Sequence, residues 1–276
     1  IKWNGSLEWS SAMKDQEKLI ESVNELQSYP KYTPTSVIGH KKAKKLEPHI
    51  NFKGNENIIF SKADGAIDPK DAISKMIDVI KKNGGSVLYP CKFERIIESN
   101  DSFSKVKTSM GILKSENVVF CNGVDVDNSF NVNFLKKPRP GVIIKTKPQK
   151  NLINSVVYGP KIHAHQQSNG QIIIGEQITA PIKKNTKDHI KRINKHFKSM
   201  VKGGTDLNPS EVLIGWRPIP KDDLPIIGKF KNKSVYIAVM HSGISLAAIV
   251  GNLVTQEIVD EVDSLLLKDF RPSRFF

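Results

Sequence analysis

The architecture of this chain is indicated most clearly by the stretch Val235-Tyr236-Ile237-Ala238-Val239-Met240-His241-Ser242-Gly243-Ile244-Ser245-Leu246. Its pattern predicts a buried strand over residues 235–240, a tight polar turn at 241–243 and a helix over 245–262. The helix carries apolar side chains at Leu246, Ile249, Val250, Leu253 and Ile258. At the start of such a helix, unpaired N–H groups and the positive end of the helix dipole attract negative charge. Because Gly243 has no side chain, the turn suits a flat ligand with negative charge on a carbonyl oxygen.

A proline-rich segment precedes this turn, Gly215-Trp216-Arg217-Pro218-Ile219-Pro220-Lys221-Asp222-Asp223-Leu224-Pro225-Ile226-Ile227-Gly228. Together the two segments resemble the C-terminal signature of the D-amino acid oxidase/glycine oxidase/sarcosine oxidase family of FAD-dependent oxidoreductases. In that family, a G-x-R-P…D-x-x-P-x-I-G segment precedes a strand and an H-S-G-like turn against the flavin pyrimidine ring. The closing Phe270-Arg271-Pro272-Ser273-Arg274-Phe275 is similar to the F-R-P-x-R-F tail of many bacterial members. An ordinary βα unit explains the helix start alone equally well, but not the two linked segments.

The composition gives bounds on partners and size. The 276 residues suffice for one large or two small domains with a substantial core. The net charge is +14, yet only six of the 42 basic residues are arginines. Nucleic-acid readers usually use arginine and aromatic platforms, whereas these lysines are scattered. We therefore expect a solvated basic surface that attracts anionic substrates and no nucleic-acid partner.

The two cysteines, Cys91 and Cys121, lack metal-ligand or redox spacing. Two buried thiols in a reducing compartment are expected rather than a disulfide, which favours a cytoplasmic protein. The apolar run over residues 235–254 is interrupted by His241, Ser242, Gly243 and Asn252, so we expect a strand, turn and helix rather than a membrane span.

One element of the family pattern is missing. The eighteen glycines nowhere form G-x-G-x-x-G, although the family begins with a βαβ unit that carries this fingerprint and binds the FAD pyrophosphate. The resemblance implies that this N-terminal FAD-binding portion lies outside the sequence, was cleaved away or lies on another polypeptide. We expect that the 276 residues alone do not form a closed FAD site.

The expected fold class is α/β, with a Rossmann-like FAD-binding domain of the glutathione reductase type, incomplete here, and a substrate domain with a mixed, largely antiparallel sheet. Residues 1–50, 62–124 and 205–276 are assigned mainly to the FAD-binding domain, and 51–61 and 125–204 mainly to the substrate domain. Strands are expected at 5–7, 57–61, 86–97, 103–108, 111–113, 117–121 and 142–146. Helices are expected at 15–28, at 185–200, and after Asp68-Pro69, which cap a helix with apolar residues at Ile73, Met76, Ile77 and Ile80 and an end at Gly84-Gly85.

Residues 161–176 predict a hairpin that pivots on Asn169-Gly170. With a two-residue turn, His165 faces Ile174 and His163 faces Glu176 across the strands. The two-residue period then places six side chains on one face of the sheet: His163, His165, Gln167, Ile172, Ile174 and Glu176.

The resemblance implies three substrate-binding residues. Arg217 is the arginine of G-x-R-P, which clamps the substrate carboxylate in relatives; its alternative is an ion pair with Asp222 or Asp223. His163 falls where glycine oxidase-like members place a substrate-contacting tyrosine; its alternative is a hydrogen bond with Glu176. His165 points to the same face, and a metal site is weakly indicated because a third ligand is missing.

The resemblance also implies a noncovalent FAD site, since the turn lacks the cysteine that carries covalent flavin in sarcosine oxidase-like members. The predicted cofactor-binding residues are Cys121, Gly123, Met240, His241, Ser242, Gly243, Ile244, Ser245 and Leu246. Asn122, between the first two, departs from the small residues common there. On the helix over 185–200, His189 and His196 are expected to face solvent or pack at its edge.

The implied reaction is oxidation of the C–N bond of an amino acid or secondary amine by hydride transfer to flavin, which leaves an imine. Two alternatives remain open. The chain is a noncatalytic or electron-transfer subunit of a multi-subunit flavin amine dehydrogenase, or a family member that oxidises a 2-hydroxy acid.

Overall fold

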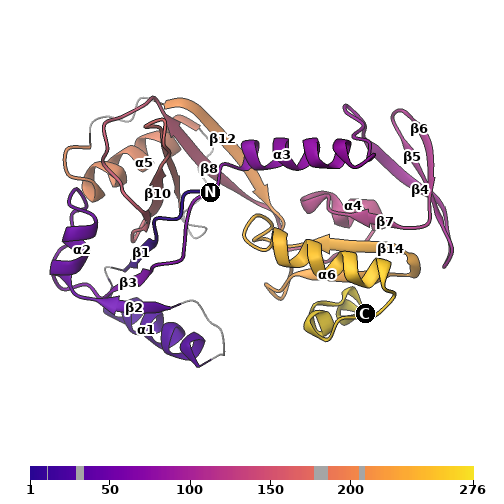
Figure 1. Ribbon diagram of the computed structural model, residues 1–276, viewed down its shortest axis with the longest axis horizontal. Coiled ribbons are helices and arrows are strands. Elements are labelled where there is room, and N and C mark those ends of the chain that lie inside the picture. The colour runs from indigo at the N-terminus through magenta and orange to yellow at the C-terminus, as the bar shows by residue number, and fades with distance from the viewer. Residues whose placement is uncertain (11, 29–33, 177–185, 205–208) are drawn as a thin grey trace. The chain divides into compact units, whose positions relative to one another are not determined.

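The computed structural model describes residues 1–10, 12–28, 34–176, 186–204 and 209–276 (Figure 1). The chain folds as two compact units, each built from two separate parts of the sequence. The first comprises Ile1–Ala72 and Pro140–Gly215, and the second comprises Ile73–Arg139 and Trp216–Phe276. Both units combine helices and strands, as expected for an α/β protein. Which unit contacts flavin and which contacts substrate stays a prediction.

The first unit contains a mixed sheet of eight strands in the order β12-β8-β11-β10-β9-β1-β3-β2. Its strands are β1 Ser6–Trp9, β2 Thr35–Ile38, β3 Ile58–Ser61, β8 Arg139–Thr146, β9 Val156–Tyr158, β10 Ile162–Gln166, β11 Ile172–Glu176 and β12 Pro209–Arg217. Strands β1 and β9 pair in parallel, whereas β10 is antiparallel to β9 and β11. Its helices are α1 Met13–Gln27, α2 His40–Leu46 and α5 Thr186–Met200.

Helices α2 and α5 cover one face of this sheet and form the core with it. Ala43 of α2 and Phe197 of α5 are buried against Ile162 and Ile174 of the hairpin. Along β10, every second residue is buried, as the two-residue period of a half-covered strand requires. The opposite face therefore carries the polar side chains of β10.

The second unit holds two three-stranded sheets, ordered β13-β14-β7 and β4-β5-β6. Its elements are α3 Pro69–Lys82, which begins in the first unit, β4 Phe93–Ser99, β5 Ser104–Thr108, β6 Gly111–Ser115, β7 Val118–Phe120, η1 Gly123–Asp125, α4 Val126–Phe130, β13 Ile226–Phe230, β14 Asn232–Val239, α6 Ala247–Val259, η2 Leu265–Phe270 and η3 Pro272–Phe275. Val250 and Leu253 of α6 pack on one face of the first sheet. An aromatic layer that includes Phe120, Phe130 and Phe230 covers its other face.

Most predicted elements are confirmed, with boundaries shifted by a few residues, but the strand predicted over 86–97 begins only at Phe93, so residues 86–92 were wrongly predicted as strand. Helix α6 was predicted over residues 245–262. It starts two residues later, at Ala247, and ends three residues earlier, at Val259. Strands β2, β9, β12 and β13 were not predicted, because they are short or lack a clear alternation. Asn185, the expected start of α5, lies outside the described residues.

Helix α3 has its predicted start but not a buried face. Asp68 Oδ1 accepts hydrogen bonds from the N–H groups of Lys70 and Asp71, as an N-cap does. Gly84, with φ of 83°, follows its end. The apolar stripe nevertheless stays exposed, with Ile73 at 53% and Met76 at 54%.

The cysteines differ in part from expectation. Both are free thiols, as predicted, but Cys91 is only partly buried and Cys121 is exposed, so their burial was wrongly predicted. In the ranges that the structure describes, no helix combines the length and apolarity needed to cross a lipid bilayer.

Candidate functional site

The hairpin of β10 and β11 has a different register from the one predicted. Gln167 N–H donates to Gln171 O at 2.8 Å, which closes a loop of three residues rather than two. Gly170 has φ of +83°, the left-handed conformation that ends such a loop. His163 therefore lies opposite Gly175, and His165 lies opposite Ile173.

This one-residue shift moves part of the predicted set to the other face. Ile172, Ile174 and Glu176 are buried beneath the helices, whereas His163 and His165 are half-buried on the opposite face. The prediction that all six side chains share one face was wrong.

Gly175 makes room for the His163 ring. A Cβ atom at residue 175 would overlap the imidazole, so a larger residue there requires the ring to move. On its other side, His163 lies next to Tyr158, with ring centroids 6.0 Å apart and planes tilted by 33°. The packing on both sides fixes where the imidazole lies.

Glu176 is part of a buried ion cluster with α5. Its carboxylate contacts His189 Nδ1 at 3.0 Å and accepts a hydrogen bond from Arg192 Nη2 at 2.6 Å. Burial raises its pKa, but the hydrogen bonds from Arg192 and His189 outweigh this and hold the pKa of Glu176 below its usual range. The suggested pairing of His163 with Glu176 was therefore wrong. The expected surface position of His189 was also wrong, because this side chain is buried.

His165 lines a cavity of about 500 Å³ in the first unit, together with Lys2, Asp68 and Gln167. Burial, followed by the charges of His163 and Lys2, lowers the pKa of His165, so its imidazole is neutral at physiological pH. Asp68 accepts a hydrogen bond from Gln167 Nε2 at 2.8 Å, which joins the start of α3 to the end of the hairpin. No group of His, Cys, Asp and Glu among the described residues has a geometry that holds a metal ion.

Tyr158 of β9 lies opposite His163 of β10 on one side and opposite Glu8 of β1 on the other, so these polar residues form a row across three neighbouring strands. Burial raises the pKa of Glu8, and Asp64 adds to this. Burial also raises the pKa of the Tyr158 phenol, with further contributions from Asp64 and Glu8. This row was not predicted from the sequence, since β9 itself was not predicted.

In the second unit, Arg217 ends β12 close to His241. Burial lowers the pKa of Arg217, which still stays charged at neutral pH. Burial also lowers the pKa of His241, and the charge of Arg217 lowers it further. The carboxylates considered as partners of Arg217 have other ion pairs: Asp222 binds Arg274, and Asp223 binds Lys136.

The predicted flavin-contacting turn occupies residues 241–246 and is largely exposed. A Cβ atom on Gly243 would have no neighbour nearer than Met240 O at 3.9 Å. Leu246, at the N-cap of α6, provides no side-chain hydrogen bond, and the N–H groups of Leu246 and Ala247 donate to Ser242 O at 3.0 Å and Ile244 O at 3.3 Å within the turn itself. This open turn fits a flat ring with carbonyl oxygens.

A second set of groups lies at the end of β7. Gly123 has φ of +58°, and a Cβ atom there would lie 3.8 Å from Pro218 Cγ. Asn122 donates to Ser129 Oγ at 2.8 Å, but its Oδ1 is buried with no hydrogen-bond partner in the described part of the chain. An acceptor of this kind fits a ligand hydroxyl or N–H group. Cys121 is exposed, although partial burial raises the pKa of its thiol.

Comparison with known proteins gives matches over most of the chain. The family model described as FAD dependent oxidoreductase, DAO, matches residues 1–257. The structure of L-proline dehydrogenase from P. horikoshii is 20% identical with a TM-score of 0.85, over 99% of this chain and 77% of that one. Glycine oxidase from Geobacillus kaustophilus is 15% identical with a TM-score of 0.82, over 98% of this chain and 74% of that one. At these identities, the two structures bear on the fold alone.

A curated relative is the bifunctional protein ThiO/ThiG of Trichormus variabilis (strain ATCC 29413 / PCC 7937). It is 25% identical over 190 residues, which make up 66% of this chain. The matched region spans 29% of that protein's length.

Proposed function

Because this chain belongs to the DAO family of FAD-dependent oxidoreductases, as its two signature segments predicted, we propose that it oxidises the C–N bond of an amino acid or related secondary amine. Flavin supplies the acceptor for the hydride equivalent, and water hydrolyses the resulting imine. The observation that carries the proposal is the partly buried Arg217, placed near His241 at the start of the open turn.

Arg217 binds the substrate carboxylate in this proposal. A guanidinium offers two parallel N–H donors that match a carboxylate, and partial burial strengthens such a contact.

The cofactor is bound noncovalently by the residues of the two sets described above. The turn over 241–246 would hold the flavin ring, and Gly123 would leave room for the dinucleotide beside β7. Asn122 Oδ1 would accept a hydrogen bond from the cofactor, since it lacks a partner among the described residues.

His163 and His165, both on β10 of the first unit, are the other two residues assigned to substrate contact in this proposal. Burial lowers the pKa of His165, so its imidazole is uncharged at physiological pH and can donate a hydrogen bond to the substrate or accept one from it without adding a positive charge. His163 takes the place of a tyrosine in glycine oxidase-like members, and Gly175 gives its ring the space it needs.

A test uses the full-length protein and two substrate panels. Noncovalent FAD should copurify and be released on denaturation. Glycine, sarcosine and L-proline should reduce the flavin, whereas methylamine, dimethylamine and pyrrolidine, which lack the carboxylate, should not. Reduction by glycolate and L-lactate alone would support the alternative of 2-hydroxy acid oxidation. A colourless protein that does not take up FAD would contradict the proposal and support a noncatalytic subunit.

A further inference from the structure

We propose that Arg274, in the C-terminal tail, is a positioning residue that holds Arg217 in place through the loop over residues 218–224. This inference rests on the proposed function of Arg217 as the carboxylate-binding residue. It concerns the F-R-P-S-R-F tail, for which the proposed reaction provides no use.

The guanidinium of Arg274 uses all five of its N–H donors. Nε and Nη2 donate to the two oxygens of Asp222 at 2.6 and 3.0 Å. Nη2 also donates to Leu224 O at 3.0 Å. Nη1 donates to Phe270 O at 2.8 Å and to Arg271 O at 3.1 Å. One side chain therefore joins the tail to two residues of the loop by a rigid, fully satisfied fork.

Asp222 is shaped to accept this fork. Its Oδ1 also accepts the N–H of Leu224 at 3.1 Å, so the carboxylate and the loop backbone form one hydrogen-bonded turn. The hydrogen bond from Arg274 holds the pKa of Asp222 below its usual range. The pair is therefore charged at every pH at which the enzyme is expected to work.

The loop is also held by a second segment, residues 134–136. Lys136 N–H donates to Ile219 O at 2.8 Å, and Lys221 N–H donates to Phe134 O at 2.9 Å. Lys136 Nζ contacts Asp223 at 2.6 Å. Arg217 lies at the start of this loop, so a loop bonded to two separate segments limits where its guanidinium can lie.

The Arg274 to Asp222 pair is suited to positioning rather than to holding the fold together. Side-chain exposure is 19% for Arg274 and 35% for Asp222, so water can solvate either group after the other is removed. Partly exposed pairs contribute less to stability than buried ones, even when they are bidentate. Their bidentate geometry contributes precision, and a small displacement of a binding group weakens binding strongly.

The experiment measures acetate binding by the full-length, FAD-loaded protein, followed by the flavin absorbance change. Arg274→Ala should weaken acetate binding about tenfold, with little loss of thermal stability. Arg274→Lys should keep the charge but not restore binding, because an ammonium cannot reproduce the fork. Lys229→Ala is the matched control, since Lys229 forms an exposed pair with Asp263 at 3.0 Å, away from the loop.

The decisive comparison is made in the Arg217→Ala background. If Arg274 acts through Arg217, Arg217→Ala/Arg274→Ala should bind acetate as weakly as Arg217→Ala alone. Equal weakening in both backgrounds would overturn the proposal, as would unchanged binding in Arg274→Ala. If Arg274→Ala folds poorly, Asp222→Asn removes the ion pair from the other side and should give the same pattern.

Amide hydrogen exchange separates this inference from the proposed function. Arg274→Ala should speed exchange at residues 219 and 221–224, which have amides in the loop, more than elsewhere in the protein. If exchange is faster in Arg274→Ala but Arg217→Ala leaves acetate binding unchanged, then Arg274 holds the loop but Arg217 does not bind the carboxylate. Unchanged exchange in Arg274→Ala would show that Arg274 does not hold the loop and would overturn the inference.

Discussion

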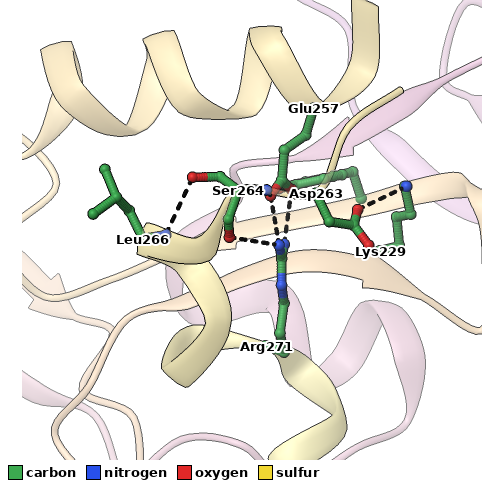
Figure 2. Close-up of polar contacts among 7 residues, drawn as sticks. Lys229, Glu257, Asp263, Ser264, Leu266 and Arg271 are labelled. Atoms are coloured by element: carbon green, nitrogen blue, oxygen red, sulfur yellow. Dashed lines mark hydrogen bonds and ion pairs between the residues drawn. The ribbon is translucent and has the colours of Figure 1, made fainter. Parts of the chain in front are cut away.

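Removing Arg271 should destabilise the protein far more than removing any exposed ion-pair residue. Glu257 of α6 has a side chain that is 0% exposed, and Arg271 is its charged partner (Figure 2). Arg271 Nη1 donates to Glu257 Oε2 at 2.7 Å, and Tyr236 OH and Ser264 N–H donate to the same carboxylate. Arg271→Ala leaves a buried carboxylate without its cation, which costs about 3–5 kcal/mol of unfolding free energy.

The assay is urea denaturation of the full-length protein at two pH values. Burial raises the pKa of Glu257, but the hydrogen bonds from Arg271 and Tyr236 hold it below its usual range. The contribution of the pair is therefore present above the unfolded-state pKa of about 4.5 and is lost as pH falls through the folded pKa. In Arg271→Ala, burial dominates and Glu257 prefers its protonated form. The loss of stability should therefore be large at about pH 7 and smaller at about pH 5.

Two variants serve as controls for this prediction. Lys229→Ala removes a pair whose side chains are 35% and 69% exposed, and should cost at most about 1 kcal/mol (Figure 2). Glu257→Gln/Arg271→Ala should recover part of the stability, because no charge is then left buried. A loss below about 1 kcal/mol for Arg271→Ala that does not change with pH would refute the reasoning.

Variants at three further positions, Arg217, Gly175 and His165, test the site. Arg217→Ala should lower kcat/KM for a carboxylate substrate by about 30-fold to several thousand-fold, with flavin binding unchanged; normal turnover would exclude Arg217 from the site. Gly175→Ala should displace the His163 ring, raise KM and lower the melting temperature. Adding His163→Ala to this variant should restore the melting temperature but not KM. An unchanged KM in Gly175→Ala alone would argue against a role for His163. Because burial lowers the pKa of His165, its contribution to stability is present above about pH 6.5 and is lost as pH falls toward the folded value, so His165→Gln should flatten the pH dependence of the melting temperature below that point.

The sequence was a good guide wherever the signal was local. The start of α3 depends on Asp68 and Pro69 alone, and both lie where an N-cap and a first helical residue are expected. The strand, turn and helix around Gly243 depend on a short apolar run and a polar break. These features are determined by neighbouring residues, so a single sequence is enough to predict them.

The register of the hairpin could not be predicted with the same ease. The pair Asn169-Gly170 is compatible with loops of two or three residues, and only the conformation of Gly170 distinguishes them. Because of this register error, Glu176 was assigned to the wrong face of the sheet. Its partners, His189 and Arg192, lie on α5, 13 and 16 residues further along the sequence, and no local pattern pairs them with Glu176.

The two motifs of the C-terminal half are linked by direct packing. Gly228, the glycine of P-x-I-G, has φ of +148°, and a Cβ atom there would lie 3.0 Å from Arg271 Cδ and 3.1 Å from Pro272 Cδ. Asp222, near the other end of the same segment, binds Arg274. Gly228 therefore lets the tail approach the segment, while Asp222 fixes the tail to it. A D-x-x-P-x-I-G segment and an F-R-P-x-R-F tail each need the other, which explains in physical terms why both are found together in this chain.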